Sequence, residues 1–210
     1  MTLKIALTKG RVERQFVELL DKMNIDTAPL KNKQRKLQIS LARDRYEFIL
    51  AKGPDVMTYL SNGVMDIGIV GSDILMEQDL EAFELLDLNV GKCQFILAST
   101  TDFNMQSPGR KVIGTKYPKI AQKYFASQGQ DVEIIKIEGS VELAPLIGLA
   151  DAIVDITETG TTLRENNLKI YAWLPKVSTR LVANPLSLKQ KKAEIFNFVD
   201  ELAKVIPSEK

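Results

Sequence analysis

A regular alternation of short apolar strands and short helices after residue 110 constrains the fold more than any other feature of this chain. Strands are predicted at 111–117, 132–139 and 151–157, and helices at 118–129 and 140–150. A helix between two strands carries the chain back across the sheet, so that the strands run parallel. This part of the chain is therefore predicted to be an α/β unit with a parallel sheet.

The two ends of the chain indicate the same fold class. Apolar periodicity predicts strands at 3–9, 37–42, 47–53, 65–71, 168–174 and 177–184, and helices at 12–23, 55–63, 72–79, 161–166 and 185–206. Asp55 and Ser72 are predicted to cap their helices, and Ser140 to cap the helix at 140–150. The polar stretch at 101–111 contains Pro and Gly and is the predicted domain boundary.

Two segments of the chain, 55–75 and 140–163, share one pattern. Each has a capped helix, a glycine, two further residues, an aspartate, an apolar strand and a glycine-containing loop. Gly63 to Asp66 and Gly148 to Asp151 have the same spacing. Chance produces such similarity too, because any helix–strand–helix unit resembles another. A true repeat would give two similar lobes, each with a loop at the carboxyl ends of its strands, where α/β sheets bind ligands.

Composition excludes several kinds of function. With 28 Lys and Arg against 27 Asp and Glu, the net charge of +1 gives no strong field for nucleic acid or a membrane. The chain contains no histidine, which excludes His-based triads and His-rich metal sites. Its single cysteine, Cys93, is predicted to fill a strand and fits a reducing compartment. The sequence shows neither a secretion signal nor a long apolar run, so a cytoplasmic location is predicted.

The stretch DAIVDITETGTTLREN, residues 151–166, carries the most specific chemistry. Side chains alternate along a strand, so Asp155 and Thr157 share one face of the predicted strand. The strand leads into a loop of threonines around Gly160, whose hydroxyl and backbone N–H donors suit a phosphate at a helix N-terminus. Asp155 can only accept hydrogen bonds when ionised and suits sugar hydroxyls, so the stretch predicts a site for a ribose phosphate. Glu158 must point away from an anion or meet Mg²⁺, and a threonine-capped helix without a ligand is the structural alternative.

The motif VDITETGTTL resembles the phosphoribosyl-pyrophosphate (PRPP) signature of phosphoribosyltransferases. Other segments narrow the resemblance: IALTKGR, RKL at Arg35, the segments 55–75 and 139–168, and VSTRLVANP, in that order. Together they are similar to the ATP phosphoribosyltransferases, which catalyse the first step of histidine biosynthesis, over essentially the whole chain. The length indicates the short form of that family, because the long form has an additional C-terminal regulatory domain.

The resemblance implies a fold of two α/β lobes like those of type II periplasmic binding proteins, with the active site in a cleft between them. Lobe I would comprise residues 1–90 plus 172–210, on the ATP side, and lobe II residues 91–171, with the PRPP loop. The reaction joins N1 of ATP to C1 of PRPP, releases pyrophosphate and requires Mg²⁺. Short-form chains act with a regulatory subunit related to histidyl-tRNA synthetase, in a hetero-octamer that histidine inhibits.

The resemblance also implies roles for individual residues. Asp155 would bind the ribose hydroxyls, and Thr159, Gly160, Thr161 and Thr162 the 5′-phosphate, with Thr157 and Glu158 also in the PRPP site. The catalytic residues, facing the triphosphate and the leaving pyrophosphate, would be Lys9, Arg11, Arg35 and Lys52. The ATP site would include Gly10, Gly68, Gly71, Asp73 and Glu142. No metal ligand is predicted among the side chains. The sequence departs from the family pattern where Gly53-Pro54 follows Lys52, and where Thr161 replaces a basic residue of several members.

Other interpretations fit parts of the pattern. A non-catalytic solute-binding or effector-sensing module would share the bilobal fold but does not require an acidic residue that binds ribose hydroxyls. A salvage phosphoribosyltransferase usually has two adjacent acids before the loop, whereas Ile156 follows Asp155 here. The lysines and arginines would also suit a solvated surface. Gly68 and Gly71 would also allow close packing, and Asp73 and Glu142 would also suit the first turns of helices.

Overall fold

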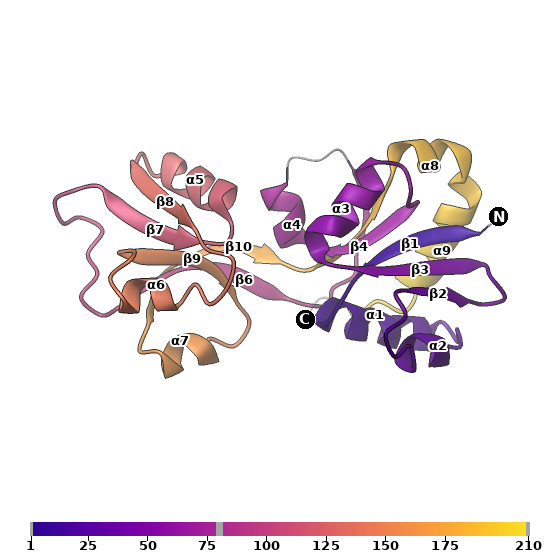
Figure 1. The fold of residues 1–210 in the computed structure, drawn as a ribbon. Helices are drawn as coiled ribbons and strands as arrows, with labels where there is room; N and C mark the ends of the chain where they lie inside the picture. The colour runs from indigo at the N-terminus through magenta and orange to yellow at the C-terminus, as the bar shows by residue number, and fades with distance from the viewer. Residues whose placement is uncertain (1, 79–81, 209–210) are drawn as a thin grey trace. The chain divides into compact units, whose positions relative to one another are not determined.

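The computed structural model describes residues 2–78 and 82–208 and divides the chain into two compact units (Figure 1). Unit 1 comprises Met1–Lys92 and Ser178–Lys210, and unit 2 comprises Cys93–Val177. The predicted boundary at 101–111 is wrong, because this polar stretch lies inside unit 2 and connects two of its strands, β6 (Cys93–Ser99) and β7 (Lys111–Thr115). Across residues 2–78 and 82–208, the structure has no helix that is both long enough and apolar enough to span a membrane.

The described part of unit 1 contains a six-stranded sheet in the order β2-β3-β1-β4-β11-β5. Its strands are β1 (Leu3–Thr8), β2 (Gln38–Leu41), β3 (Tyr46–Ala51), β4 (Ile67–Gly71), β5 (Phe83–Asp87) and β11 (Thr179–Ala183). β3, β1 and β4 are parallel neighbours, whereas β2, β11 and β5 each pair antiparallel. The sheet is therefore mixed rather than purely parallel, because a tight turn joins β2 to β3 and β11 enters the sheet from unit 2.

Helices cover both faces of the unit 1 sheet. They are α1 (Arg11–Lys22), α2 (Ala28–Lys31), α3 (Gly53–Ser61), α4 (Ser72–Glu77), α8 (Pro185–Gln190) and α9 (Lys192–Ala203). Leu3, Ile5 and Leu7 of β1 belong to a core with residues of α1, α2 and α9, whereas Ala6 packs with residues of α3 on the opposite face. Burial of alternate residues on two faces is what fixes β1 in the middle of the unit.

Several predicted helix ends differ from those in the structure. α3 begins at Gly53, so Asp55 lies in its first turn rather than at the cap, and Gly71 rather than Ser72 precedes α4. The end of the helix predicted at 72–79 falls at Asp79, outside the described residues. The single helix predicted at 185–206 is two helices, because the chain leaves the helical conformation at Lys191, with φ −126° and ψ 33°.

The described part of unit 2 contains a five-stranded sheet in the order β10-β6-β9-β7-β8. In addition to β6 and β7, its strands are β8 (Val132–Lys136), β9 (Ala152–Thr157) and β10 (Lys169–Val177). β8, β7 and β9 run parallel, and β6 and β10 complete the sheet antiparallel. The half-buried Cys93 begins β6, as its prediction as a strand residue requires.

Three helices of unit 2 lie on the two faces of its sheet: α5 (Pro118–Ser127), α6 (Leu143–Leu146) and α7 (Thr161–Glu165). Figure 1 shows α5 on one side of the strands and α6 and α7 on the other. α6 is much shorter than the helix predicted at 140–150 and begins after Glu142 rather than after Ser140. The helix ends before Gly148, which has φ +71°, a conformation that breaks a right-handed helix.

The two segments of the repeated sequence pattern share one structural feature, the contacts of their aspartates. The Asp66 N–H donates to the Lys4 carbonyl at 2.9 Å, and the Lys4 N–H donates to Asp66 Oδ2 at 2.9 Å. In unit 2 the Asp151 N–H donates to the Val112 carbonyl at 2.8 Å, and the Val112 N–H donates to Asp151 Oδ2 at 2.7 Å. Each aspartate thus fixes the start of a parallel strand against its neighbour, and Asp151 is a strand-entry residue.

Gly68 of β4 shows how closely α3 packs on the unit 1 sheet. A Cβ at this position would lie 3.0 Å from Val56 Cγ1 and 3.1 Å from Val182 Cγ2. We expect Gly68→Ala to lower the free energy of unfolding by about 1–3 kcal/mol, because the core has no room for the added methyl group. Urea denaturation measures this. Gly139→Ala is the matched control, because a Cβ there meets nothing within 4 Å, and an equal loss in both variants would contradict the packing argument.

Candidate active site

The predicted phosphate loop follows β9 and lines a pocket of about 220 Å³ that lies wholly within unit 2. The residues around it are Ile96, Glu142, Asp155, Ile156, Thr157, Glu158, Thr159, Gly160, Thr161, Thr162 and Leu163. The pocket therefore brings together Glu142 and every residue predicted for the PRPP site. Asp151 is exposed and is not among the lining residues, which agrees with its structural role.

Asp155 has the most perturbed environment in the pocket. Burial raises the pKa of Asp155 to about 6, and the nearby charge of Glu142 acts in the same direction. The Ile156 N–H, which donates to Asp155 Oδ1 at 2.8 Å, and the charge of Lys116 oppose this increase in the pKa. A half-buried carboxylate with a raised pKa inside a polar pocket is typical of a ligand-binding group.

The loop after β9 is held by its own threonines. Gly160 has φ +69°, and its N–H donates to Thr157 Oγ1 at 3.0 Å. The hydroxyls of Thr159 and Thr161 lie 3.0 Å apart. α7 has only five residues, so its helix dipole is smaller than that of a longer helix and contributes less to anion binding than the sequence predicted. Hydroxyl groups and loop amides are consequently the main donors that the pocket offers to an anion.

Basic residues of unit 1 meet at one edge of its sheet. Lys9 follows β1 and Lys52 follows β3, and the Lys9 N–H donates to the Ala51 carbonyl at 2.9 Å. β4, the parallel neighbour on the other side of β1, ends at Gly71 on the same edge. The carboxyl ends of three parallel strands thus place Lys9, Lys52 and the start of α4 close together in the fold.

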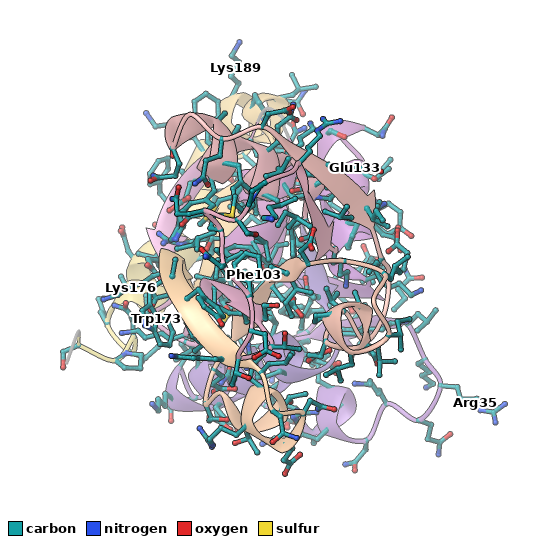
Figure 2. The ribbon with its side chains drawn as sticks, turned by 90° about the vertical axis from the view of Figure 1, so that its left-hand side faces the viewer. Arg35, Phe103, Glu133, Trp173, Lys176 and Lys189 are labelled. Atoms are coloured by element: carbon teal, nitrogen blue, oxygen red, sulfur yellow. The ribbon has the colours of Figure 1, made fainter. Side chains whose placement is uncertain are left out.

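Arg35 and Arg11 differ from each other in their exposure and in the elements that carry them. Arg35 lies in the loop that leads to β2, and the carbonyl of the nearby Leu37 accepts from the Leu50 N–H at 2.8 Å, next to the end of β3. Its exposed side chain points away from the ribbon (Figure 2). Arg11 is half-buried as the first residue of α1. Both belong to the same edge of unit 1 by their backbone positions.

The glycines predicted for the ATP site differ in environment. Gly10, with φ +93°, forms the turn between β1 and α1. A Cβ on Gly71 would overlap Asp73 Oδ1, so the carboxylate of Asp73 lies directly against the chain at Gly71. Gly68, by contrast, is buried between α3 and β11, where the absence of a side chain allows close packing, and its place in the ATP site stays a prediction.

Sequence reasoning missed two lysines. Lys33 forms an ion pair with Glu13, which is 7% exposed and whose Oε2 also accepts from the Gly10 N–H at 3.4 Å. Burial and the charge of Lys9 lower the pKa of Lys33, which places it beside the β1–α1 turn. Lys116 follows β7 and contributes to the electrostatics of Asp155. The basic run KNKQRK and the position after a parallel strand were the available signals.

Comparison with known proteins decides the family. Residues 52–204 match the HisG family, described as ATP phosphoribosyltransferase. The chain belongs to this family. An ATP phosphoribosyltransferase of Lactiplantibacillus plantarum is 66% identical over 204 residues, covering 97% of this chain and 94% of the relative. One of Lacticaseibacillus casei is 61% identical over 209 residues, covering 100% of this chain and 99% of the relative. These figures confirm the resemblance seen in the sequence motifs.

Solved structures confirm the fold. An ATP phosphoribosyl transferase (HisG:HisZ) complex from Thermotoga maritima has a chain with a TM-score of 0.83 and 36% identity, covering 98% of both chains. A periplasmic sulfonate-binding protein from Methylobacillus flagellatus has a TM-score of 0.64 at 15% identity, covering 98% of this chain and 68% of that chain. The second similarity concerns the fold alone and agrees with two lobes of the type II periplasmic-binding-protein kind.

Proposed function

We propose that this chain transfers the phosphoribosyl group of PRPP to N1 of ATP. The products are N1-(5-phosphoribosyl)-ATP and pyrophosphate, and the reaction opens histidine biosynthesis. The observation that carries the proposal is the unit 2 pocket, which combines Asp155 with a threonine-rich loop in a member of the ATP phosphoribosyltransferase family. Family membership identifies the reaction, and the residues of the pocket support unit 2 as the part of the chain that would hold PRPP.

The pocket suits the two chemically different ends of a ribose phosphate. Thr159, Gly160, Thr161 and Thr162 supply hydroxyl and amide donors for the 5′-phosphate, each charge-assisted bond stabilising it by about 1.5–3 kcal/mol. Ionised Asp155 would accept hydrogen bonds from the ribose hydroxyls. With a pKa of about 6, Asp155 is ionised at neutral pH, as this role requires.

The basic residues of unit 1 suit the polyphosphate groups of the substrates. Lys9, Arg11, Arg35 and Lys52 would bind these groups, with Gly10, Gly71, Asp73 and Glu142 contributing to the ATP site. Pyrophosphate gains negative charge as its bond to C1 breaks, so preorganised cations would stabilise the transition state. Adenine N1 attacks with its own lone pair, and the reaction therefore needs no histidine as a general base.

The residues of the unit 2 pocket are compatible with Mg²⁺ bound together with PRPP. Carboxylate oxygens and substrate phosphates are the ligands that Mg²⁺ prefers, and Asp155, Glu142 and Glu158 all line the pocket. Across residues 2–78 and 82–208, no group of three or more acidic or cysteine side chains is arranged to hold a metal by itself. Mg²⁺ would therefore depend on the pyrophosphate of PRPP, whose charge it neutralises when bound.

A protein partner is part of the proposal. The Thermotoga maritima chain comes from a HisG:HisZ complex and covers 98% of this chain. We therefore expect this chain to act in the cytoplasm with a HisZ-type regulatory subunit, related to histidyl-tRNA synthetase, in a hetero-octamer. Size-exclusion chromatography with light scattering, on the two proteins alone and mixed, measures the assembly.

The decisive assay mixes the purified chain with ATP, PRPP and Mg²⁺, with and without a HisZ-type partner, and follows the N1-ribosylated product. Product formation supports the proposal, and its absence in both mixtures contradicts it.

Thr162→Ala should weaken PRPP binding without changing the melting temperature, because the exposed hydroxyl belongs to the pocket and not to the core. A non-catalytic solute-binding module would bind a ligand and form no product.

A further inference from the structure

Arg164 of α7 lies directly on the proposed phosphate loop. Its Nη1 donates to the Thr159 carbonyl at 2.9 Å, and its Nη2 donates to Thr161 Oγ1 at 3.0 Å. A Cβ on Gly160 would lie 3.4 Å from Arg164 Nη1. One guanidinium therefore contacts the residues on both sides of Gly160 and lies against Gly160 itself.

The bond to Thr161 determines what that hydroxyl can do. A threonine hydroxyl has one hydrogen to donate and two lone pairs that accept. Because Arg164 can only donate, Thr161 Oγ1 must be the acceptor, and the hydrogen of Thr161 stays available for another acceptor. In the structure the neighbouring oxygen is Thr159 Oγ1 at 3.0 Å, and in a complex a phosphate oxygen would compete for the same hydrogen.

The charge of Arg164 also fits the position. From Thr157 to Glu165, Arg164 is the only basic residue, and the same stretch contains Glu158 and Glu165. Asp155 and Glu142 add two further acids to the pocket lining. Lys116, whose charge acts on Asp155, is a further cation, but these four acids still outnumber the two basic residues. A cation fixed to the loop therefore lowers the electrostatic cost of binding a phosphate dianion.

We propose that Arg164 is a positioning residue for PRPP: its guanidinium holds Thr159 and Thr161 so that the loop is preorganised for the 5′-phosphate. This inference rests on the proposed function and deepens it. The two N–H groups of the fork bind two acceptors at a fixed separation, which a lysine ammonium cannot reproduce in the same geometry. Arg164 acts through the two threonines, so its loss affects PRPP and leaves ATP binding unchanged.

Steady-state kinetics of the chain with its HisZ-type partner test this proposal. Initial rates are measured against PRPP and against ATP for wild type, Arg164→Met and Arg164→Lys. We expect Arg164→Met to raise KM for PRPP by about tenfold or more, the loss of a charge-assisted hydrogen bond, with KM for ATP unchanged. Arg164→Lys keeps the charge but not the fork, so its KM for PRPP should lie between the two. Arg110→Met is the matched control. Arg110 is an exposed arginine of unit 2 that lies just before β7 and forms an ion pair with Asp131.

The outcomes separate this inference from the proposed function. No product from wild type contradicts the proposed function. If wild type is active and Arg164→Met retains its KM for PRPP, the inference alone is overturned. A parallel rise of both KM values, or an equal effect of Arg110→Met, also overturns it, because a general structural defect would then explain the result. Should Arg164→Met fail to fold, as its thermal unfolding would reveal, Arg164→Lys decides by the same two KM values.

Discussion

Asp155→Asn is expected to make the protein more stable at about pH 8 while removing most of its affinity for PRPP. The carboxylate lies half-buried in the unit 2 pocket, and burial raises its pKa from 3.8 to about 6. An asparagine has the same shape, keeps an oxygen for the Ile156 N–H and carries no charge to desolvate. The variant therefore separates what Asp155 contributes to binding from what it costs the fold.

The sign of the pH dependence follows from the raised pKa of Asp155. The unfolded state releases this proton near pH 3.8 and the folded state near pH 6, so the folded state binds more protons between these values. Stability attributable to Asp155 thus falls as the pH rises through this window, by about 2–3 kcal/mol in all. Asp155→Asn avoids that loss, and its advantage in urea denaturation should be present at about pH 8 and absent at about pH 4.

The affinity measurement completes this prediction. Calorimetric titration with PRPP and Mg²⁺ at about pH 8 should show binding weakened by about 100-fold in Asp155→Asn, the loss of two hydrogen bonds to a charged acceptor. Asp151→Asn is the control, because Asp151 lies outside the pocket lining and its Oδ2 accepts from the Val112 N–H at 2.7 Å. A stability gain at about pH 4, or unchanged PRPP affinity, would show that Asp155 does not have this role.

The parts of the structure that depend on local sequence were predictable. The predicted strand at 151–157 and helix at 161–166 are confirmed as β9 and α7, because alternating side chains, Gly160 and the threonines act within a few residues of one another. The repeated aspartates were recognisable for the same reason, since each acts at the start of its own strand. Such features need no knowledge of the rest of the fold.

Features that depend on distant contacts were not predictable. The stretch at 101–111 has the composition of a linker between domains. Only the pairing of both β6 and β7 with β9 shows that it connects two strands of one sheet. The sequence predicts Lys33 to be a surface residue, and only the fold shows its ion pair with Glu13 of α1. The break at Lys191 coincides with a tertiary contact, in which Lys191 Nζ donates to Asp66 Oδ2 at 2.7 Å.

Asp66→Ala is expected to destabilise the protein far more than Asp151→Ala, although the two residues occupy equivalent positions in the repeat. Asp66 is 6% exposed and accepts from the Lys4 N–H at 2.9 Å, Ser187 Oγ at 2.8 Å and Lys191 Nζ at 2.7 Å. Its removal leaves the ammonium of Lys191, whose side chain is 20% exposed, without this partner. Losing one member of a buried ion pair costs about 3–5 kcal/mol.

Asp151 provides the comparison within the same molecule. It is exposed, and its side chain accepts from the Val112 N–H, so Asp151→Ala should cost about 1 kcal/mol, the value of one hydrogen bond. Urea denaturation of both variants measures the difference, and similar losses would contradict the argument. Asp66→Ala combined with Lys191→Met should recover part of the stability, because no buried charge is then left unpaired.

The same contacts predict where the damage from Asp66→Ala should appear. Ser187 lies on α8 and Lys191 joins α8 to α9, so the carboxylate of Asp66 ties β1, the start of β4 and the C-terminal helices to one point. Hydrogen exchange should therefore accelerate in α8 and at the Lys4 amide in Asp66→Ala, while the amides of β7 and β9 in unit 2 keep their protection. One sequence motif thus serves local strand entry in unit 2, whereas in unit 1 the burial of its aspartate makes it an anchor for helices far away in the chain.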